Sequence, residues 1–462
     1  MFLFSASRSS LMVMLALQAA LVCTTVAAAA RSQTSWPSAL AAGGSFLLLP
    51  ITNEQMSMVM TELLLTLFCL LAVLAWARYL SSPSLWRSAC FSLLASAAIF
   101  VKGDAVSLAL VPPLSLLLMW NLRLVRQWHF WVAPGLTCLL CGPYYFWTRS
   151  LAALGWVGGE KPSFAYTIST LPEMGSALAR TLGAPLLVLT GLGLVACLTL
   201  RCQRQNVLVS SVSSLLLGGL ALEAVIPAGM EDRKLYFLLP ACLILATIGT
   251  HSLLAWSRPA LSLRAAGALT SLLLLGAAAS HFQLVSRYDR GFRDVANLLK
   301  QEIDDKVAVV LVSSNYNGEG LLIASVAEAH PRPAPYVIRA NEVLADAGWA
   351  QPTYHLRTET TDKVAQELSA LQPGFLVLHD VADFRAIPHH DLIKALVKKS
   401  PGSYSCIFTR TVQTNMGMER LEVYRAFPIT GATPNLESVY SHLQKSLSKF
   451  LILKKEGTRR PN

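Results

Sequence analysis

Charged side chains beside long apolar runs are the residues of this chain whose types could do chemistry. They gather in four stretches: Glu54 and Glu62 in "PITNEQMSMVMTELLLTLF", Lys102 and Asp104 in "FVKGDAVSL", Glu223 in "LALEAV", and Glu231, Asp232, Arg233 and Lys234 in "AGMEDRKLYFLLP". A carboxylate can accept a proton from a reacting group, and a cation in a dry site can stabilise negative charge that develops during a reaction. Charged residues at membrane depth are costly and usually functional, so these stretches form the candidate site.

The elements that must position these residues are apolar segments, and a segment needs about 20 residues to span a bilayer. The sequence predicts ten of them: 9–30, 37–52, 56–77, 88–102, 104–120, 129–148, 182–200, 207–228, 235–256 and 265–284. The chain of 462 residues is 53% hydrophobic and 14% charged, whereas soluble domains are about 25% charged. We therefore predict a polytopic α-helical membrane bundle of about ten helices, in which Pro112 and Pro113 kink the fifth segment.

The composition changes after residue 285, which predicts three parts. Residues 1–285 form the membrane domain, 286–434 a soluble α/β domain, and 435–462 a basic amphipathic tail. The apolar residues of the tail recur at helical spacing, so the tail could lie on a membrane surface or dock onto its own domain.

The soluble domain alternates strand-like and helix-like stretches, which predicts a small doubly wound or mixed sheet. The predicted strands are 306–314, 335–340, 374–380, 404–410 and 420–427, and the predicted helices include 361–371 and 390–399. Thr360 and Thr361 are candidate caps for the first of these helices.

Two polar groups in this domain could suggest a ligand. The loop "SSNYNGEG" follows a strand and opens a helix, where a phosphate could bind, but it fits neither glycine-rich nucleotide motif. We favour a plain turn. His379, His389 and His390 with Asp380 and Asp383 match no metal-ligand spacing, and we expect solvated loop residues.

The loop charges predict the orientation of the bundle. The loops 31–36, 78–87, 121–128, 201–206 and 257–264 contain nine arginines and no acidic residue, whereas the alternate loops contain six basic and six acidic residues. An excess of Lys and Arg marks the cytoplasmic side. The alternate loops, with the candidate site, are therefore predicted to face outward from a plasma or inner membrane, and so is the soluble domain that follows the tenth segment.

The N-terminus allows two interpretations. Arg8, an apolar stretch and "VAAAA" imitate a secretory signal with a cleavage site. Cleavage would require 37–52 to be re-entrant, so we favour a retained helix, with which all crossings alternate.

The charge distribution argues against one function class, and the cysteine positions argue against a disulfide framework. The net charge of +11 forms no basic face with interleaved aromatic residues, which argues against nucleic-acid binding. Eight of the nine cysteines lie in or beside apolar segments and only Cys406 lies in the soluble domain, so that domain has no disulfide framework.

The stretches around the charged residues resemble the multi-spanning C-type glycosyltransferases that use polyprenyl-phosphate-linked sugars, in particular the protein-mannosyltransferase-like and aminoarabinose-transferase-like group. The resemblance is carried by "MTELLL", "ARYL", "VKGDA", "GPYYFWTR" and "RKLYFLLP", in this order, and covers about residues 10–256.

The resemblance implies an outward carboxylate that activates an acceptor hydroxyl, which then attacks the anomeric carbon of the sugar. It also implies basic residues that stabilise the departing lipid phosphate, in some members with a divalent metal. Carried over by position, the matches are Glu62 with Glu54 as catalytic carboxylates, Lys102, Arg233 and Lys234 as phosphate contacts, and Tyr236 as a residue lining the lipid or sugar cleft. The partners implied are a membrane lipid, the polyprenyl-phosphate-linked sugar and an acceptor that the resemblance does not identify.

The sequence departs from the family in one respect. The family places its principal catalytic Asp in the first outward loop, after a first transmembrane helix, whereas this chain begins at what resembles the second helix. We therefore expect that helix and that Asp to be lacking, because of a misassigned gene start, a fragment or a loss of catalysis. Glu54 is a candidate substitute.

Two alternatives stand beside the enzyme. In the first, Glu62 and Glu223 pair with cations such as Lys102 or Arg233 only to hold helices together, since intramembrane charges usually pair. In the second, the chain is a membrane scaffold or a transporter with an outward α/β binding domain. A transporter would be favoured by an inverted repeat with broken helices, and we find no such repeat in the sequence.

Overall fold

A computed structural model describes most of the chain. The described residues are 8–57, 60–152, 161–199, 206–227, 229–257, 262–283, 289–303, 308–330, 335–346, 354–381, 387–414 and 417–427. The chain divides into two compact units, which we call the membrane unit (Met1–Arg149 with Gly159–Val285) and the sheet unit (Ser150–Gly158 with Ser286–Asn462). The predicted tail, 435–462, and Asp383 lie outside the described residues.

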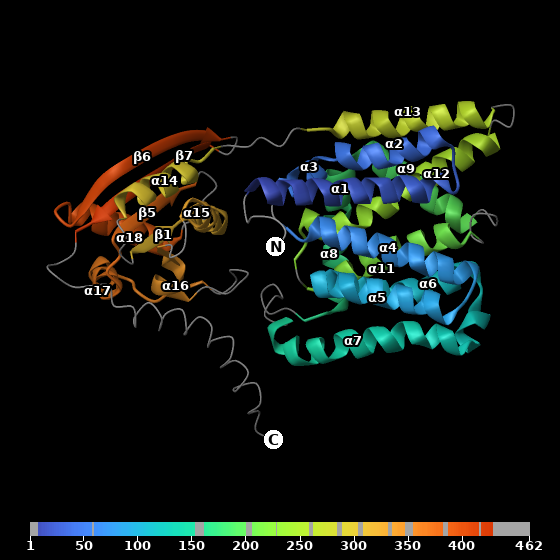
Figure 1. Ribbon diagram of the computed structural model, residues 1–462, viewed down its shortest axis with the longest axis horizontal. Coiled ribbons are helices and arrows are strands. Elements are labelled where there is room, and N and C mark those ends of the chain that lie inside the picture. Colours follow the sequence, from blue (N-terminus) through green and yellow to red (C-terminus); the bar gives the residue numbers. More distant parts are fainter. Residues whose placement is uncertain are drawn as a thin grey trace, which may run out of the picture. The chain divides into compact units, whose positions relative to one another are not determined.

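The membrane unit is a bundle of helices (Figure 1). Its α-helices are α1 (Arg8–Arg31), α2 (Trp36–Leu48), α3 (Pro50–Gln55), α4 (Glu62–Ser81), α5 (Leu85–Val101), α6 (Val111–Met119), α7 (Trp128–Ala152), α8 (Phe164–Leu182), α9 (Ala184–Thr199), α11 (Val207–Val225), α12 (Leu239–Ser257) and α13 (Leu263–His281), and its 3₁₀ helices are η1 (Gly103–Leu110), η2 (Leu122–Arg126) and η5 (Asp232–Leu238). Each of the ten predicted apolar segments contains a helix or a pair of them. Among the described residues, four helices are long and apolar enough to cross a membrane, and five if α8 and α9 are one bent span.

The structure corrects the predicted fifth segment. Pro112 and Pro113 do not kink a continuous helix, because the segment is divided into η1 and α6, and the prolines lie in the first turn of α6. Proline is tolerated there, since the first turn has N–H groups without intrahelical partners. The segment predicted from residue 56 likewise begins later, at Glu62, with Thr61 at the N-cap.

The helix α8 lies in a stretch that the sequence predicts to be an outward loop. Its first turn is capped by Ser163, whose side chain accepts a hydrogen bond from the Tyr166 N–H. Gly183, in the left-handed region with φ +76°, ends it, and α9 leaves at 112° to it. Its buried residues include Met174, Ala177 and Leu178, so one face packs on the bundle.

Two glycines allow α9 and α12 to approach closely. A Cβ on Gly193 would lie 2.2 Å from the Leu245 carbonyl oxygen, and a Cβ on Gly249 would lie 2.2 Å from the Gly193 Cα. Any larger residue would have to push the two backbones apart.

The sheet unit contains a five-stranded mixed sheet in the order β2-β1-β5-β7-β6. The strands are β1 (Val309–Ser313), β2 (Tyr336–Arg339), β5 (Phe375–Asp380), β6 (Tyr404–Thr414) and β7 (Gly417–Ala426). β1 is parallel to both β2 and β5, whereas β7 is antiparallel to β5 and β6. A two-residue pair, β3 (Ala345–Asp346) with β4 (His355–Leu356), forms a second, small sheet.

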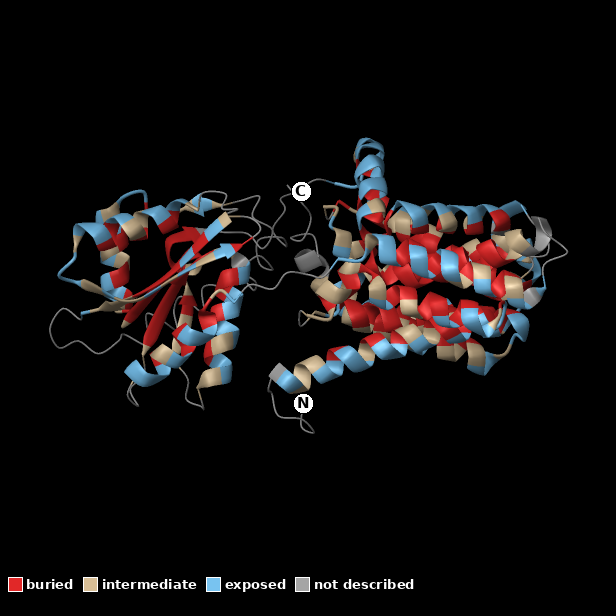
Figure 2. Cartoon of the chain, turned by 90° about the horizontal axis from the view of Figure 1, so that it is seen from above, coloured by how far each residue is buried: buried red, intermediate tan, exposed pale blue. Residues whose placement is uncertain are grey.

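Helices cover both faces of the large sheet, and its central strands are buried (Figure 2). One face packs on α14 (Phe292–Glu302) and α15 (Tyr316–Ala329), and the other on α16 (Ala340–Leu344), α17 (Thr361–Leu371) and α18 (Pro388–Lys399). Thr360 caps α17, as predicted, by accepting from the Lys363 N–H. The fold class predicted from sequence, a membrane bundle with a C-terminal α/β domain, is confirmed.

Candidate functional site

The candidate residues meet at one end of the membrane unit because the helices that carry them begin or end there. Glu54 lies in α3, Glu62 in the first turn of α4, Lys102 between α5 and η1, and Glu223 near the end of α11. The 3₁₀ helix η5, which packs against α3, α4 and α11, carries the remaining candidates. We call this group of charged residues the outward cluster, after the side of the membrane that the loop charges predict for it.

Lys102 lies at the centre of the outward cluster, between two carboxylates. Its ammonium is 3.3 Å from Glu62 Oε1 and 2.9 Å from Asp104 Oδ2. The Glu62 side chain is 4% exposed, the Lys102 side chain 26% and the Asp104 side chain 22%. The charges thus compensate each other in a place largely shielded from water.

A third carboxylate, Glu223, is buried on α11. The charges of Asp104, Lys102 and Lys234 all act on it. The Lys234 ammonium also donates a hydrogen bond of 2.6 Å to the Gly229 carbonyl. The structure therefore brings Glu223 into the electrostatic environment of Lys102 and Lys234, two of the predicted phosphate contacts.

Arg233 and Glu54 form the more exposed part of the outward cluster. Arg233 is ion-paired with Glu231 and its Nη1 lies 4.0 Å from Met60 Sδ, in the turn before α4. The charges of Arg233 and Asp232 act on Glu54. The two predicted catalytic carboxylates thus have different surroundings: Lys102 neighbours Glu62, and η5 neighbours Glu54.

Ion pairs and hydrogen bonds fix η5 in place. The Arg180 guanidinium at the end of α8 binds both carboxylate oxygens of Asp232, with its shortest contact at 2.6 Å. The carbonyl of Arg180 is in turn 2.7 Å from His281 Nε2, at the end of α13. Tyr236, which is fully buried, donates a hydrogen bond of 3.3 Å to Thr52 Oγ1 of α3. Tyr236 therefore holds α3 against η5, and its prediction as a cleft-lining residue stays untested.

The sequence reasoning had named Asp104 and Glu223 as charged residues but had left them out of the candidate catalytic set. The Lys102 contact shows that Asp104 belongs with Glu62. The signal that could have found it is the spacing Lys-Gly-Asp at the end of an apolar segment, which keeps the carboxylate within one turn of the lysine. The structure also contains a contact of the kind that the alternative of helix-holding ion pairs requires, because Lys102 joins α4 to the α5–η1 junction.

A divalent metal, used by some members of the resembled family, finds no obvious ligand set here. The residues that the structure describes contain no group of three or more His, Cys, Asp or Glu side chains that could hold a metal ion. Within the outward cluster, the space between Glu62 and Asp104 is taken by the Lys102 ammonium. We therefore assign no step to a metal.

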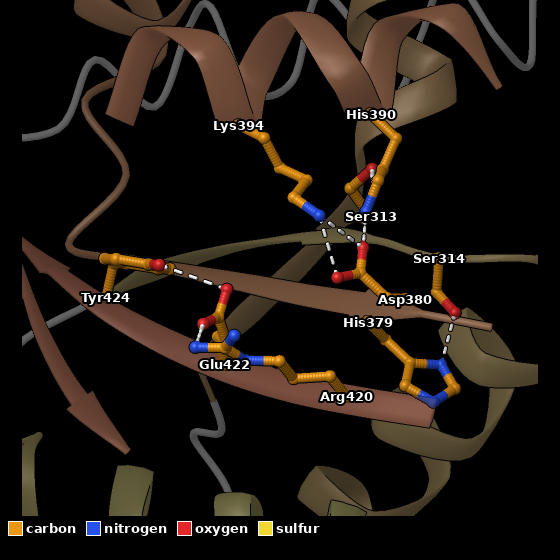
Figure 3. Close-up of polar contacts among 9 residues, drawn as sticks. All are labelled: Ser313, Ser314, His379, Asp380, His390, Lys394, Arg420, Glu422 and Tyr424. Atoms are coloured by element: carbon orange, nitrogen blue, oxygen red, sulfur yellow. Dashed lines mark hydrogen bonds and ion pairs between the residues drawn. The ribbon is translucent and has the colours of Figure 1, made fainter. Parts of the chain in front are cut away.

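A second polar cluster lies where β1 and β5 end in the sheet unit (Figure 3). Ser313 Oγ is 2.8 Å from His390 Nδ1, whose Nε2 is 2.8 Å from Asp380 Oδ1, and Lys394 donates to both Asp380 oxygens. On the opposite face, Ser314 Oγ is 2.8 Å from His379 Nδ1. Both serines are buried, so neither hydroxyl is open to a substrate, although the order Ser–His–Asp imitates a hydrolase triad.

These contacts correct the prediction that His379, His389 and His390 are solvated. All three are buried; His379 faces Glu419 at 3.4 Å, and His389 Nδ1 is 2.7 Å from the Tyr354 hydroxyl. Burial lowers the pKa of His379 to about 4 and that of His389 to about 3. Hydrogen bonds from His390 and Lys394 hold the pKa of the Asp380 carboxyl well below its usual range.

The loop "SSNYNGEG" forms the turn favoured from the sequence. Asn315 caps α15 by accepting a hydrogen bond of 2.8 Å from the Gly318 N–H. Glu319, in the first turn of α15, is buried and bound by Arg339 at 2.7 Å. The first turn of α15 thus already has a hydrogen-bond acceptor, the side chain of Asn315, and a carboxylate, that of Glu319.

Comparisons with known proteins identify the fold. No protein-family model matches the sequence, and no curated protein matches it. Among solved structures, ArnT from Cupriavidus metallidurans bound to undecaprenyl phosphate is 13% identical, with a TM-score of 0.53 over 93% of this chain and 86% of that chain. ArnT in the apo state is 13% identical, with a TM-score of 0.54 over 91% and 84%. Arabinofuranosyltransferase AftD from Mycobacteria gives a TM-score of 0.47 at 16% identity, over 91% of this chain and 33% of that chain.

The chain therefore has the fold of ArnT. This confirms, for the fold, the resemblance to the aminoarabinose-transferase-like group that the sequence indicated.

Proposed function

We propose that this protein is a membrane glycosyltransferase that transfers a sugar from a polyprenyl-phosphate donor to an acceptor on the outward face of the membrane. One observation carries the proposal: in a chain with the ArnT fold, Lys102 is held between Glu62 and Asp104 where the outward cluster forms. ArnT itself has been solved with undecaprenyl phosphate bound. A polyprenyl phosphate supplies both the apolar chain that such a bundle can hold and the phosphate that the cations can bind.

The cations of the outward cluster support binding of the donor phosphate. The Arg233 side chain is 43% exposed and its partner Glu231 is 51% exposed. An exposed ion pair contributes only about 0–1 kcal/mol, so a phosphate can replace Glu231 at little cost. Lys234 and Lys102 lie deeper, where a charge is screened less by water and acts more strongly on a leaving phosphate.

The carboxylates of the outward cluster support activation of the acceptor. A positioned carboxylate that takes the proton of a hydroxyl contributes roughly 10²–10⁴-fold to the rate. Glu62 and Glu54 are the residues that the family resemblance assigns to this work, and Glu62 also fixes Lys102.

The test uses the full chain, purified and reconstituted into phospholipid vesicles with a panel of undecaprenyl-phosphate-linked sugars. We expect Glu62→Ala and Arg233→Ala each to abolish transfer while the protein still inserts and folds. Arg293→Ala is the matched control, because Arg293 lies in the sheet unit, 61% exposed and paired with Glu328; we expect it to transfer like the wild type. Unchanged transfer in both test variants would refute the proposed site.

The same variants test a non-catalytic role, which the Glu62–Lys102 pair specifically favours because it joins α4 to the start of η1. A scaffold in which this pair only holds helices together would show no transfer in any protein. Glu62→Ala should lower the Tm under either role, because the half-buried Lys102 loses one of its two carboxylate partners, so transfer by the wild type decides between the two roles.

A further inference from the structure

We infer that Asp104 is the carboxylate that accepts the proton of the acceptor hydroxyl, and that Glu62 instead holds the lysine between them. This assignment rests on the proposed function and names the base within its site. It arises from three observations about Asp104: its central place, its exposure, and the lysine that it shares with Glu62.

Asp104 lies directly beside Lys102 at the centre of the outward cluster. It lies in the first turn of η1, which packs against α4, α5 and α11. Its charge acts on groups from four other elements: Cys69 of α4, Tyr145 of α7, Glu223 of α11 and Lys234 of η5. The charge of Asp104 therefore acts on Lys234, one of the predicted phosphate contacts.

Exposure separates Asp104 from the other carboxylates near Lys102. The Glu62 side chain is 4% exposed, and its Oε2 atom is buried without a hydrogen-bond partner among the described residues. Glu223 is also buried. Asp104 is 22% exposed, and since its Oδ2 atom is buried against Lys102, the exposed part of the side chain lies elsewhere. Of these three carboxylates, Asp104 alone is open enough for an acceptor hydroxyl to reach.

The shared lysine suits Asp104 to the task. Before the reaction, the Lys102 ammonium is ion-paired with Asp104 at 2.9 Å. Once Asp104 is protonated, the Lys102 ammonium still has Glu62 at 3.3 Å. The half-buried Lys102 ammonium thus keeps a carboxylate partner in the protonated state, and loss of every partner would be unfavourable.

The step balances as a simple displacement. The acceptor hydroxyl gives its proton to Asp104 while its oxygen forms a bond to the anomeric carbon of the donor sugar. The bond between that carbon and the phosphate oxygen breaks, and the polyprenyl phosphate leaves with the electron pair. Asp104 then releases the proton to solvent through its exposed side.

The experiment compares Asp104→Asn, Asp104→Ala and Glu62→Ala in the full chain in vesicles, with the same donor panel. For Asp104→Asn we expect kcat to fall by about 10²–10⁴-fold, the loss of one general base, with KM and binding of undecaprenyl phosphate within about twofold of wild type. Added formate should restore part of the activity of Asp104→Ala, because a small carboxylate can enter the vacated space. Formate should not rescue Glu62→Ala, whose defect is a displaced lysine.

Three results would overturn the assignment. The first is an Asp104→Asn protein with more than half of the wild-type kcat. The second is formate rescue of Glu62→Ala but not of Asp104→Ala, which would make Glu62 the base. The third is a lower Tm in Asp104→Asn together with its loss of kcat, and no formate rescue of Asp104→Ala. That combination would make Asp104 a structural residue. Absence of transfer by the wild type from every donor is a separate outcome, which overturns the proposed function itself.

Discussion

The buried histidines of the sheet unit show how one side chain's surroundings can differ from what its neighbours in the sequence suggest. His379 continues the strand alternation of β5, with Phe375 and Val377 on the same face. The sequence places His379 at the end of the predicted strand 374–380, and the expectation that its side chain is solvated is wrong because the side chain is buried. The two-residue period of a strand was the available signal, since it places His379 in the core and Asp380 on the other face.

These histidines make the sheet unit sensitive to acid. Both are neutral in the folded state, with pKa values of about 4 for His379 and about 3 for His389, whereas an unfolded histidine has a pKa near 6.5. The unfolded chain therefore binds protons first as the pH falls. The free energy of unfolding should drop by about 1.4 kcal/mol per pH unit for each histidine between pH 6.5 and its folded pKa, and the contribution is fully present above pH 6.5.

Hydrogen exchange of the full chain can measure this effect, with protection of the β1 and β5 amides corrected for the intrinsic rate. Burial raises the pKa of Glu319 to about 7. The contribution of Glu319 to the free energy of unfolding therefore decreases as the pH rises from 4.5 to 7, which partly masks the opposite effect of the histidines. The decisive quantity is the difference in amide protection between the wild type and His389→Gln, because the contribution of Glu319 is the same in both proteins and cancels. The wild type should lose more protection than the variant between pH 6.5 and 5. His355→Gln, at an exposed residue, serves as the control, and parallel pH curves for wild type and His389→Gln would contradict the prediction.

The helices of the membrane unit follow their apolar segments closely, but their breaks were harder to predict. A continuous apolar run does not show where a helix changes to a 3₁₀ turn, as it does at Gly103–Leu110 and Asp232–Leu238. α8 was missed for a different reason. It is amphipathic and carries Glu173 and Arg180, so a search for uninterrupted apolar stretches passes over it, whereas a search for helical periodicity would have found it.

The contact between α9 and α12 yields a prediction about helix packing. Gly193→Ala should destabilise the bundle by about 1–3 kcal/mol, the usual cost of overpacking, because its Cβ would lie 2.2 Å from a backbone oxygen. Gly191 lies two residues earlier on the same helix, and a Cβ added there would meet nothing within 4 Å, so Gly191→Ala is the control. It should be neutral or stabilising by up to about 1 kcal/mol. The Tm of the two proteins in one detergent measures the difference, and equal Tm values would show that α9 and α12 can separate freely.

For the whole chain, the sequence was sufficient for the fold class because two independent signals agreed. Apolar length predicted the bundle, and the alternation of strand and helix predicted the sheet domain; the structure contains both. The composition of the candidate site was less predictable. The approach of Glu62 to Lys102 depends on how α4 packs against α5 and η1, and no spacing along the chain specifies the packing of distant helices.

The sidedness of the sheet unit remains a prediction from the loop charges, and Cys406 can test it. Its thiol is exposed in β6, and it was the only cysteine of the predicted soluble domain. A membrane-impermeant maleimide should label it in intact cells without lysis, because we propose that the sheet unit faces outward. Cys406→Ser should lose this label and identify background from the other cysteines. Labelling only after lysis would place the sheet unit in the cytoplasm and reverse the orientation of the bundle.

The strand order also has a consequence for the biogenesis of the protein. The central strand β5 (Phe375–Asp380) pairs with β1 on one side and with β7 (Gly417–Ala426) on the other. β7 is the last described strand to emerge during synthesis, so one edge of a buried, apolar strand stays open until the ribosome has passed residue 426. Open apolar edges invite pairing with other chains. The newly made domain should therefore depend on chaperone protection over this interval, and truncations that remove β7 should aggregate rather than fold into a smaller sheet.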